Sequence, residues 1–208
     1  MELDRNTIPD IVIGRLPLYL RALQSMASDG RLVTSSQELG ERLGISAAQI
    51  RKDLSSFGEF GKQGTGYRID FLISQLSEIL QVSRIWDVVL VGAGDVGHAI
   101  SNYQGFENRG FRIAAVFDND PKKVGTKTGS FVIKGTAELG SEIRENGYKI
   151  AMIAVPAAQA QKVAEQLIEA GIQAILNYAP VSLVVPAHVH IQYNDPAASL
   201  QRMTYYLD

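Results

Sequence analysis

Residues 88–97 read VVLVGAGDVG, an apolar run that leads directly into three glycines and the start of a helical pattern. Gly92 permits the tight turn out of a buried strand, and Gly94 lets the backbone approach a ligand with no side chain in between. Gly97 allows the next helix to pack closely on the sheet, with its N-terminal amides toward a phosphate. The combination predicts a site for the pyrophosphate of a dinucleotide. The alternative is a glycine-rich turn in another βαβ fold.

A second apolar run, residues 111–117, ends in Asp118, about 20 residues after the last glycine. A carboxylate at this position accepts hydrogen bonds from an adenosine ribose and repels a 2′-phosphate. Asn119 follows, with no adjacent arginine to bind that phosphate, so NADH or NAD is favoured over the 2′-phosphorylated cofactors. We expect the Asp95 carboxylate to point outward, away from the phosphates. The candidate cofactor contacts in these two segments are Gly92, Ala93, Gly94, Asp95, Val96, Gly97 and Asp118.

The composition bounds the class of protein. The chain has 208 residues, 46% of them hydrophobic, enough for one large or two modest domains. It contains no cysteine, which excludes disulfides, cysteine-ligated metal centres and thiol redox sensing. No apolar run reaches the roughly 18 residues of a membrane span, and the N-terminus lacks the apolar core of a signal peptide. A cytoplasmic protein is expected, and any redox sensing must use a bound ligand.

The first 80 residues predict a helix-turn-helix. A helix over residues 10–27 contains Pro17, which implies a late start or a kink. Two capping boxes follow, one of Ser35 with Glu38 and one of Ser46 with Gln49, and each begins a short helix. A glycine turn at position 44 separates these two helices. A further amphipathic helix is expected over residues 71–80.

The second short helix is the candidate recognition helix. Its apolar residues recur at the helical period and predict an inward face of Ala47, Ile50, Leu54 and Phe57. The remaining positions are small, polar or basic, as in helices that enter the major groove of DNA. They supply the candidate DNA contacts Ser46, Gln49, Arg51, Lys52 and Ser55. The alternative is an ordinary solvated helix face.

The next segment, residues 58–69, holds four glycines interleaved with basic and amide side chains. A glycine-rich turn between two short strands is expected here, as a wing that reaches the DNA backbone or minor groove. An ordinary surface hairpin is the alternative. The net charge of the whole chain is −2, so the basic character is local to this part of the sequence. The candidate wing contacts are Lys62, Gln63, Gly64 and Tyr67.

Strand and helix patterns alternate after residue 86, which predicts an α/β domain with a doubly wound (Rossmann) parallel sheet. The cofactor is expected at the carboxyl ends of its strands, bordered by the loops that follow Val155 and Leu176. A last helix, residues 197–207, has an apolar face that must pack on another domain or subunit. We therefore divide the chain into a winged-helix domain (1–84), a dinucleotide-binding domain (85–194) and a C-terminal dimerisation helix (195–208).

Several motifs together resemble the Rex family of redox-sensing transcriptional repressors, and the resemblance spans essentially the whole chain. They are RLPLYLR (15–21), QIRKDLSSFG (49–58), GTGY (64–67), the glycine loop, FDNDPKKVG (117–125) and ILNYAP (175–180). The resemblance implies a homodimer with a terminal helix exchanged between subunits. It implies repression of fermentation and respiration genes by binding palindromic operator DNA, with release of the DNA when NADH binds.

The resemblance also implies individual roles. Tyr103 matches a tyrosine near the nicotinamide, and Asp195 with Arg21 matches an inter-subunit ion pair associated with switching. The chain departs from the family pattern at Asp95, at His98 and at Pro196, where a different residue is usual.

A nicotinamide-dependent dehydrogenase is the main alternative. It requires a general acid or base beside the nicotinamide ring, and the three histidines are poor candidates. His98 would lie beside the phosphates, while His188 and His190 flank a late strand. We therefore expect no catalytic residue and no metal centre. A third reading is a nucleotide-responsive scaffold that has lost DNA binding, which the presence of Arg51 and Lys52 disfavours.

Overall fold

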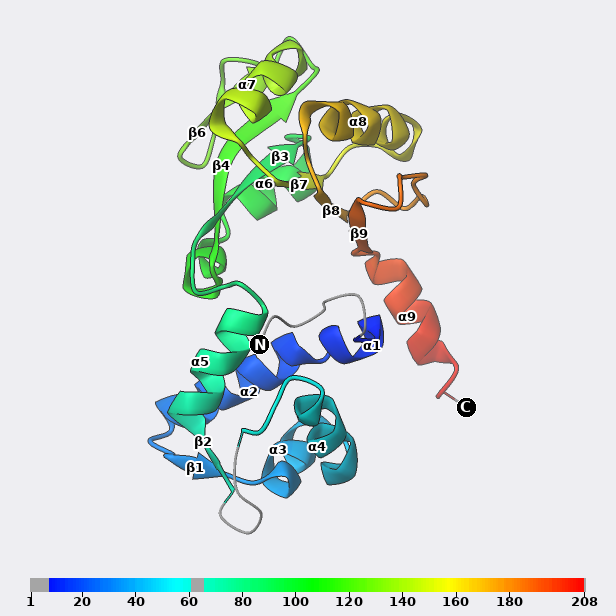
Figure 1. Ribbon diagram of the computed structural model, residues 1–208. Coiled ribbons are helices and arrows are strands. Elements are labelled where there is room, and N and C mark those ends of the chain that lie inside the picture. The colour runs from blue at the N-terminus through cyan, green and yellow to red at the C-terminus, as the bar shows by residue number, and fades with distance from the viewer. Residues whose placement is uncertain (1–7, 61–65, 208) are drawn as a thin grey trace. The chain divides into compact units, whose positions relative to one another are not determined.

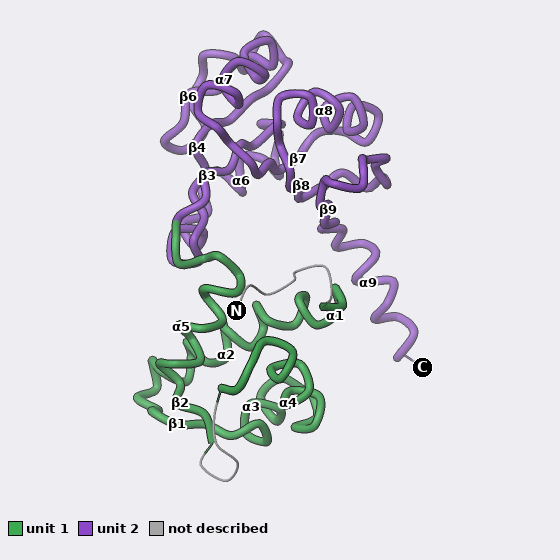
Figure 2. Tube along the Cα trace, viewed as in Figure 1, with its two compact units in different colours: residues 1–84 green, residues 85–208 purple. Residues whose placement is uncertain are grey.

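The computed structural model describes residues 8–60 and 66–207 (Figure 1). The chain forms two compact units, residues 1–84 and 85–208 (Figure 2). No helix in the described part of the chain has the length and apolar character needed to cross a membrane.

The first unit is mainly helical. Its elements are α1 (Asp10–Ile13), α2 (Leu16–Ser28), β1 (Val33–Thr34), α3 (Ser36–Leu43), α4 (Ala47–Ser55), β2 (Tyr67–Arg68) and α5 (Ile69–Ile79). The helix expected over residues 10–27 is divided between α1 and α2, and Pro17 lies in the first turn of α2. Proline is tolerated there because the first amides of a helix have no intrahelical partner. The structure thus shows a break before Pro17, with helical residues on both sides of it.

Both predicted N-caps are present. The Ser35 hydroxyl accepts the Glu38 amide at 3.1 Å, and the Ser46 hydroxyl accepts the Gln49 amide at 3.2 Å. Gly44 ends α3 in the left-handed conformation, with φ of 68°. Of the expected inward residues, Ile50, Leu54 and Phe57 pack into the core of this unit, whereas Ala47 is half-buried and is not part of it. The core includes Leu16, Tyr19, Leu20, Leu23, Met26, Leu39, Ile50, Leu54, Phe57, Leu72 and Leu76.

Part of the expected wing, residues 61–65, lies outside the described residues. The described strand β2 pairs antiparallel with β1, which precedes α3. The backbone carbonyl of Thr34 lies against Gly66, where φ is +74°, so the second strand can enter this pairing only through a residue without a side chain. Lys62, Gln63 and Gly64 lie outside the described residues.

The second unit is a seven-stranded sheet flanked by helices (Figure 1). The strand order is β5-β6-β4-β3-β7-β8-β9, and all neighbouring strands are parallel except β5 and β6. The strands are β3 (Trp86–Val91), β4 (Phe111–Asp118), β5 (Lys127–Thr128), β6 (Phe131–Gly135), β7 (Ile150–Ile153), β8 (Ala174–Asn177) and β9 (His190–Tyr193). The helices are α6 (Asp95–Ser101), α7 (Leu139–Asn146), α8 (Ala157–Ala170) and α9 (Pro196–Thr204), with 3₁₀ helices at Gln104–Arg109 and Thr136–Glu138.

Alternate residues of β3 face opposite sides of this sheet, as a doubly wound fold requires. Val89 and Val91 pack with residues of α7 and α8, whereas Val88 and Leu90 pack with Ile100 of α6. The sequence prediction of a doubly wound parallel sheet is confirmed. It omitted the β5–β6 hairpin, although the apolar run at residues 131–133 is a signal for the second of these strands.

The side chains of helix α9 are exposed, among them Leu200 and Met203, and so is Leu207 after the end of the helix; each is more than 60% accessible. Asp195 is its N-cap, and its Oδ1 accepts the Ala197 amide at 2.9 Å. Pro196 occupies the first helical position, which suits proline because that amide is not needed for an intrahelical bond. The unusual Pro196 is thus consistent with a well-formed cap at Asp195.

Candidate functional site

The glycine loop has the geometry that its sequence predicts. Gly92 has φ of 106°, and a side chain there would overlap the backbone carbonyl of Ala154 at the end of β7. A side chain at Gly97 would overlap the carbonyl of Gly92, so the loop and α6 can pack only through glycine. At Gly94, in contrast, a Cβ atom would have no protein atom within 4 Å. The space beside Gly94 is therefore available to a ligand.

A cavity of about 630 Å³ opens beside this loop. It lies at the carboxyl ends of the strands where the chain order reverses between β3 and β7, which is the usual ligand position in such sheets. The loop after Val155 borders it, as predicted. The residues that line the cavity are Val91, Gly92, Gly94, Asp118, Asn119, Asp120, Lys123, Thr136, Ala154, Val155, Pro156, Ala158, Gln159, Lys162, Val163 and Gln166.

The loop after Leu176 is not among the described residues that line this cavity, so its expected place beside the dinucleotide stays a prediction. Asn177 is buried, and its carboxamide donates to the carbonyls of Ala179 and Val181 at 3.0 and 2.9 Å. Its own carbonyl oxygen accepts the Ala179 amide. The side chain of Asn177 therefore holds the turn that follows β8.

Asp118 joins the second strand to the glycine loop. Its Oδ2 accepts the Ala93 amide at 2.8 Å and lies 3.3 Å from Lys123 Nζ, while Oδ1 accepts the Asp120 amide at 2.9 Å. Burial alone raises the pKa of Asp118, but these hydrogen bonds and the lysine outweigh it, so the pKa lies below its ordinary value. The carboxylate is charged at neutral pH and lies in the wall of the cavity.

The remaining cofactor candidates, Ala93, Asp95, Val96, Gly97 and Tyr103, are not among the described residues that line the cavity. Asp95 is exposed in the first turn of α6, and Val96 is half-exposed. Tyr103 follows α6, is half-exposed and meets Phe106 edge-to-face at 4.9 Å between ring centroids. Its ring covers Gly105 so closely that a side chain there would overlap it.

Two lysines of the cavity were not among the predicted contacts. Lys123 lies within the FDNDPKKVG motif, and Lys162 projects from α8, one helical turn after Ala158. Asn119 Nδ2 also donates to Gln159 Oε1 at 3.3 Å, which links the end of β4 to α8. The motif was a signal for Lys123, whereas only the packing of α8 brings Lys162 to the cavity.

None of the three histidines is among the described residues that line the cavity. His98 was expected beside the phosphates. In the structure its side chain contacts β5, where its Nδ1 lies 2.9 Å from the Thr128 hydroxyl. Ser101 Oγ shares the same hydroxyl at 2.9 Å. This polar cluster ties α6 to the β5–β6 hairpin.

The exposed face of α4 is the candidate nucleic-acid interface. Arg51, Lys52 and Ser55 are exposed, and Arg51 donates to the Ser36 hydroxyl of α3 at 2.9 Å. The Ser46 hydroxyl caps the helix, while the Ser55 hydroxyl donates to the carbonyl of Lys52. Tyr67 is half-buried on β2. The basic side chains of the helix are therefore positioned on one accessible surface.

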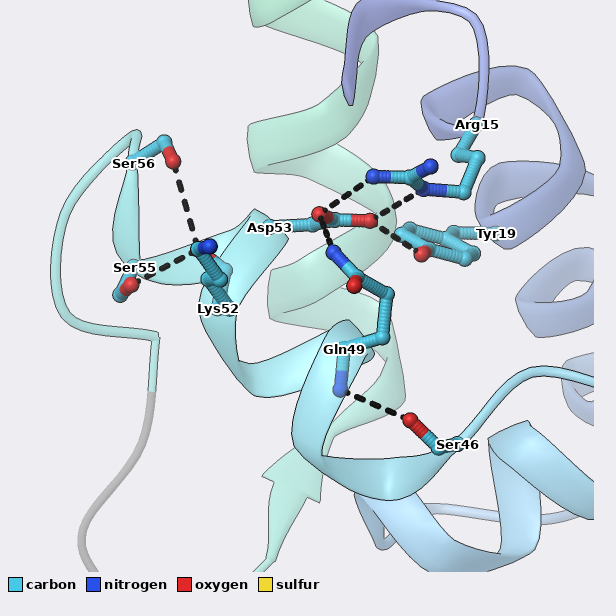
Figure 3. A network of polar contacts seen from close by, with 8 residues as sticks. All are labelled: Arg15, Tyr19, Ser46, Gln49, Lys52, Asp53, Ser55 and Ser56. Atoms are coloured by element: carbon cyan, nitrogen blue, oxygen red, sulfur yellow. Dashed lines mark hydrogen bonds and ion pairs between the residues drawn. The ribbon is translucent and has the colours of Figure 1, made fainter. Parts of the chain in front are cut away.

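Asp53 of α4 is a site residue that sequence reasoning missed (Figure 3). It is completely buried, and Arg15 binds it in a bidentate manner at 2.6 and 2.7 Å. The Tyr19 hydroxyl and Gln49 Nε2 donate to the same carboxylate at 2.6 and 2.7 Å. The side-chain amide of Gln49 is thus turned toward Asp53, and only its remaining N–H and its carbonyl oxygen are left to bind another molecule.

The protonation of this cluster follows from its contacts. Burial raises the pKa of Asp53, but the hydrogen bonds from Arg15, Tyr19 and Gln49 outweigh it and hold the pKa below its ordinary value. The bond to Asp53 raises the pKa of Arg15, and burial together with that carboxylate raises the pKa of Tyr19. At neutral pH the cluster is a charged arginine–aspartate pair with a neutral tyrosine.

The two candidate switch residues lie in different units. Arg21 is exposed on α2, and Asp195 caps α9. The predicted ion pair joins Asp195 of one subunit to Arg21 of the other, so it stays a prediction for a single chain.

Residues 83–181 match the family model described as CoA binding domain, and residues 7–55 match the putative DNA-binding protein N-terminus. The redox-sensing transcriptional repressor Rex of Chloroflexus aggregans is 54% identical over 199 residues, 96% of this chain and 94% of that protein. The Rex protein of Brevibacillus brevis is 45% identical over 200 residues, 96% of this chain and 97% of its own length.

Two solved structures match across nearly the whole chain. RSP, a Rex-family repressor, in complex with β-NAD⁺ and operator DNA has a TM-score of 0.91 and 36% identity, covering 96% of this chain and 92% of that one. RSP in complex with β-NADH has a TM-score of 0.88 and 34% identity, with 97% and 94% covered. The level of identity, its extent and the shared architecture show that this chain belongs to the Rex family of redox-sensing transcriptional repressors.

Proposed function

We propose that this protein is a cytoplasmic repressor that binds palindromic operator DNA as a homodimer and releases it when NADH binds. The observation that carries the proposal is the combination, in one chain, of a cationic helix-turn-helix and a cavity built for a dinucleotide. The matching structures that hold β-NAD⁺ with operator DNA, or β-NADH, support the same ligands here.

The cavity supports NADH and NAD as the cofactors. The open space beside Gly94 accommodates the pyrophosphate, and the buried, charged Asp118 accepts hydrogen bonds from the adenosine ribose. A 2′-phosphate would meet the Asp118 carboxylate, which disfavours NADP(H). Lys123 offsets part of this repulsion because it lies 3.3 Å from the same carboxylate.

The response to redox state follows from a difference of one hydride. NADH carries a neutral nicotinamide ring, whereas the ring of NAD is cationic, and moving a charged ring out of water is costly. We place the neutral ring in a closed site near Tyr103, with Asp195 and the partner subunit's Arg21 as the responding ion pair. The resulting change in the spacing of two recognition helices breaks their register with successive major grooves.

Homodimer formation is supported by α9. Its apolar side chains are exposed in the single chain, and a second copy provides a surface that would bury them. Catalysis is not part of the proposed function, because the relatives that match this chain over nearly its whole length are transcriptional repressors.

A band-shift titration tests the proposal. A palindromic operator duplex is bound by the protein, and NAD and NADH are added separately at the same free concentrations. Release is expected at a much lower concentration of NADH than of NAD. Equal responses to the two cofactors would remove the redox-sensing function, and turnover of common alcohols or hydroxy acids would favour a dehydrogenase.

A further inference from the structure

The recognition helix α4 carries a carboxylate that points away from its exposed face. Both oxygens of Asp53 are fully engaged: Oδ2 accepts from Arg15 Nε and the Tyr19 hydroxyl, and Oδ1 accepts from Arg15 Nη2 and Gln49 Nε2 (Figure 3). Arg15 and Tyr19 belong to the start of α2, so the carboxylate is held from outside its own helix. Its position is therefore set by the core of the unit.

Gln49 lies one helical turn before Asp53, and the two side chains meet at 2.7 Å. A carboxylate can only accept hydrogen bonds, so the amide atom that faces it must be the nitrogen. This contact removes the freedom of the amide to turn over. Gln49 is left with its carbonyl oxygen and one N–H for another partner.

The remaining carbonyl oxygen is accessible. Among the described residues, Gln49 Oε1 has no hydrogen-bond partner. Every buried side-chain oxygen or nitrogen of these residues does have a partner, so an oxygen without one is not buried. The oxygen must therefore be in contact with solvent. Gln49 also lies in the first turn of α4, next to the Ser46 cap, and helix-turn-helix proteins contact base edges with the N-terminal residues of this helix.

An acceptor beside a donor on one planar amide matches adenine in the major groove, where N6 donates and N7 accepts. We propose that Asp53 is a positioning residue that presets Gln49 to select an A·T pair in each operator half-site, and that Arg15 and Tyr19 hold Asp53 in place. The inference rests on the proposed function and deepens it by naming the base and the residues that orient its reader. A preset side chain loses less rotamer freedom on binding and holds one amide orientation.

The test begins with wild-type protein and a library of duplexes with randomised sequence, from which binding sites are selected. Each position of the selected half-site is then changed in turn, and affinities are measured with the scrambled duplex as reference. Gln49→Ala is expected to lose discrimination at one A·T pair, on the order of tenfold to a hundredfold, with unchanged affinity for scrambled DNA. Gln37→Ala is the matched control, because Gln37 makes the same kind of contact with Glu41 on α3 at 3.2 Å.

Removing the Asp53 charge alone leaves the partly buried Arg15 guanidinium without its ion-pair partner, so Asp53→Asn can fail to fold. The triple variant Arg15→Met, Tyr19→Phe and Asp53→Leu replaces the whole cluster with apolar side chains, a kind of exchange that proteins tolerate. This variant is expected to keep its affinity for scrambled DNA and lose discrimination at the same A·T pair as Gln49→Ala. Adding Gln49→Ala to it should cause no further loss there.

Two results would overturn the inference. One is a Gln49→Ala protein that keeps full discrimination at every base pair or weakens on all duplexes equally. The other is a folded triple variant with an unchanged base profile. Failure of the proposed function is distinct from both, because it appears in the wild type as no selected palindrome or no release by NADH.

Discussion

The glycine loop packs closely against α6 at Gly97 and leaves open space for a ligand at Gly94. The variants Gly97→Ala and Gly94→Ala test these two roles separately. A Cβ at position 97 would lie 2.8 Å from the carbonyl carbon of Gly92 and nearer still to its oxygen, whereas ordinary contact begins at 3.4 Å. Because the oxygen is the nearest atom, the start of α6 must move by more than about 1 Å, and core overpacking of this kind costs about 1–3 kcal/mol. The same movement displaces the backbone amides that the proposed function assigns to the pyrophosphate.

At Gly94 the backbone has φ of −80°, and a Cβ meets no protein atom within 4 Å. Alanine there leaves the fold unstrained, and the new methyl group meets only the cofactor. Loss of one hydrogen bond to a charged phosphate costs about 1.5–3 kcal/mol, or about a tenfold to a hundredfold weaker affinity for NADH.

The assays are calorimetric titration with NADH and thermal unfolding without cofactor. Gly97→Ala is expected to lower both the affinity and the unfolding temperature, whereas Gly94→Ala lowers only the affinity. A Gly94→Ala protein that binds NADH like the wild type would refute the assignment of the open space to the pyrophosphate. An unchanged unfolding temperature for Gly97→Ala would refute the packing argument.

Three further predictions follow from individual carboxylates. Asp118→Asn removes the charge that a 2′-phosphate would meet and frees Lys123, so the preference for NADH over NADPH should fall on the order of tenfold in a binding titration; an unchanged preference would contradict this. The pKa of Asp53 is lowered by folding, so its contribution to the free energy of unfolding is complete above the ordinary pKa of about 4 and is lost as the pH falls through the folded value. Denaturant unfolding as a function of pH should therefore show a weaker acid dependence for the triple variant Arg15→Met, Tyr19→Phe and Asp53→Leu than for the wild type, and parallel curves would argue against an ionised Asp53. Asp195→Asn keeps an N-cap for α9 but removes the charge, so operator release should need more NADH while helicity is retained; release at an unchanged concentration would exclude a role for that charge.

Local patterns in the sequence were sufficient for the division into a helical and an α/β part, for the cofactor loop and for the helix starts. Each of these features depends on a few neighbouring residues. Examples are the glycines at positions 92 and 97, the caps at Ser35 and Ser46 and the alternating faces of β3. Such local features can be predicted from the sequence, because the residues that form them are neighbours along the chain.

Contacts between distant residues were decided by the tertiary structure alone. Asp53 looks like one more charged residue of α4, yet its partners Arg15 and Tyr19 lie 38 and 34 positions earlier and meet it only when α2 packs on α4. The pairing of β1 with β2 and the approach of Lys162 to the cavity are of the same kind. A charged side chain becomes a buried anchor only where packing removes water from it and supplies donors in its place, and no pattern along the chain records where that occurs.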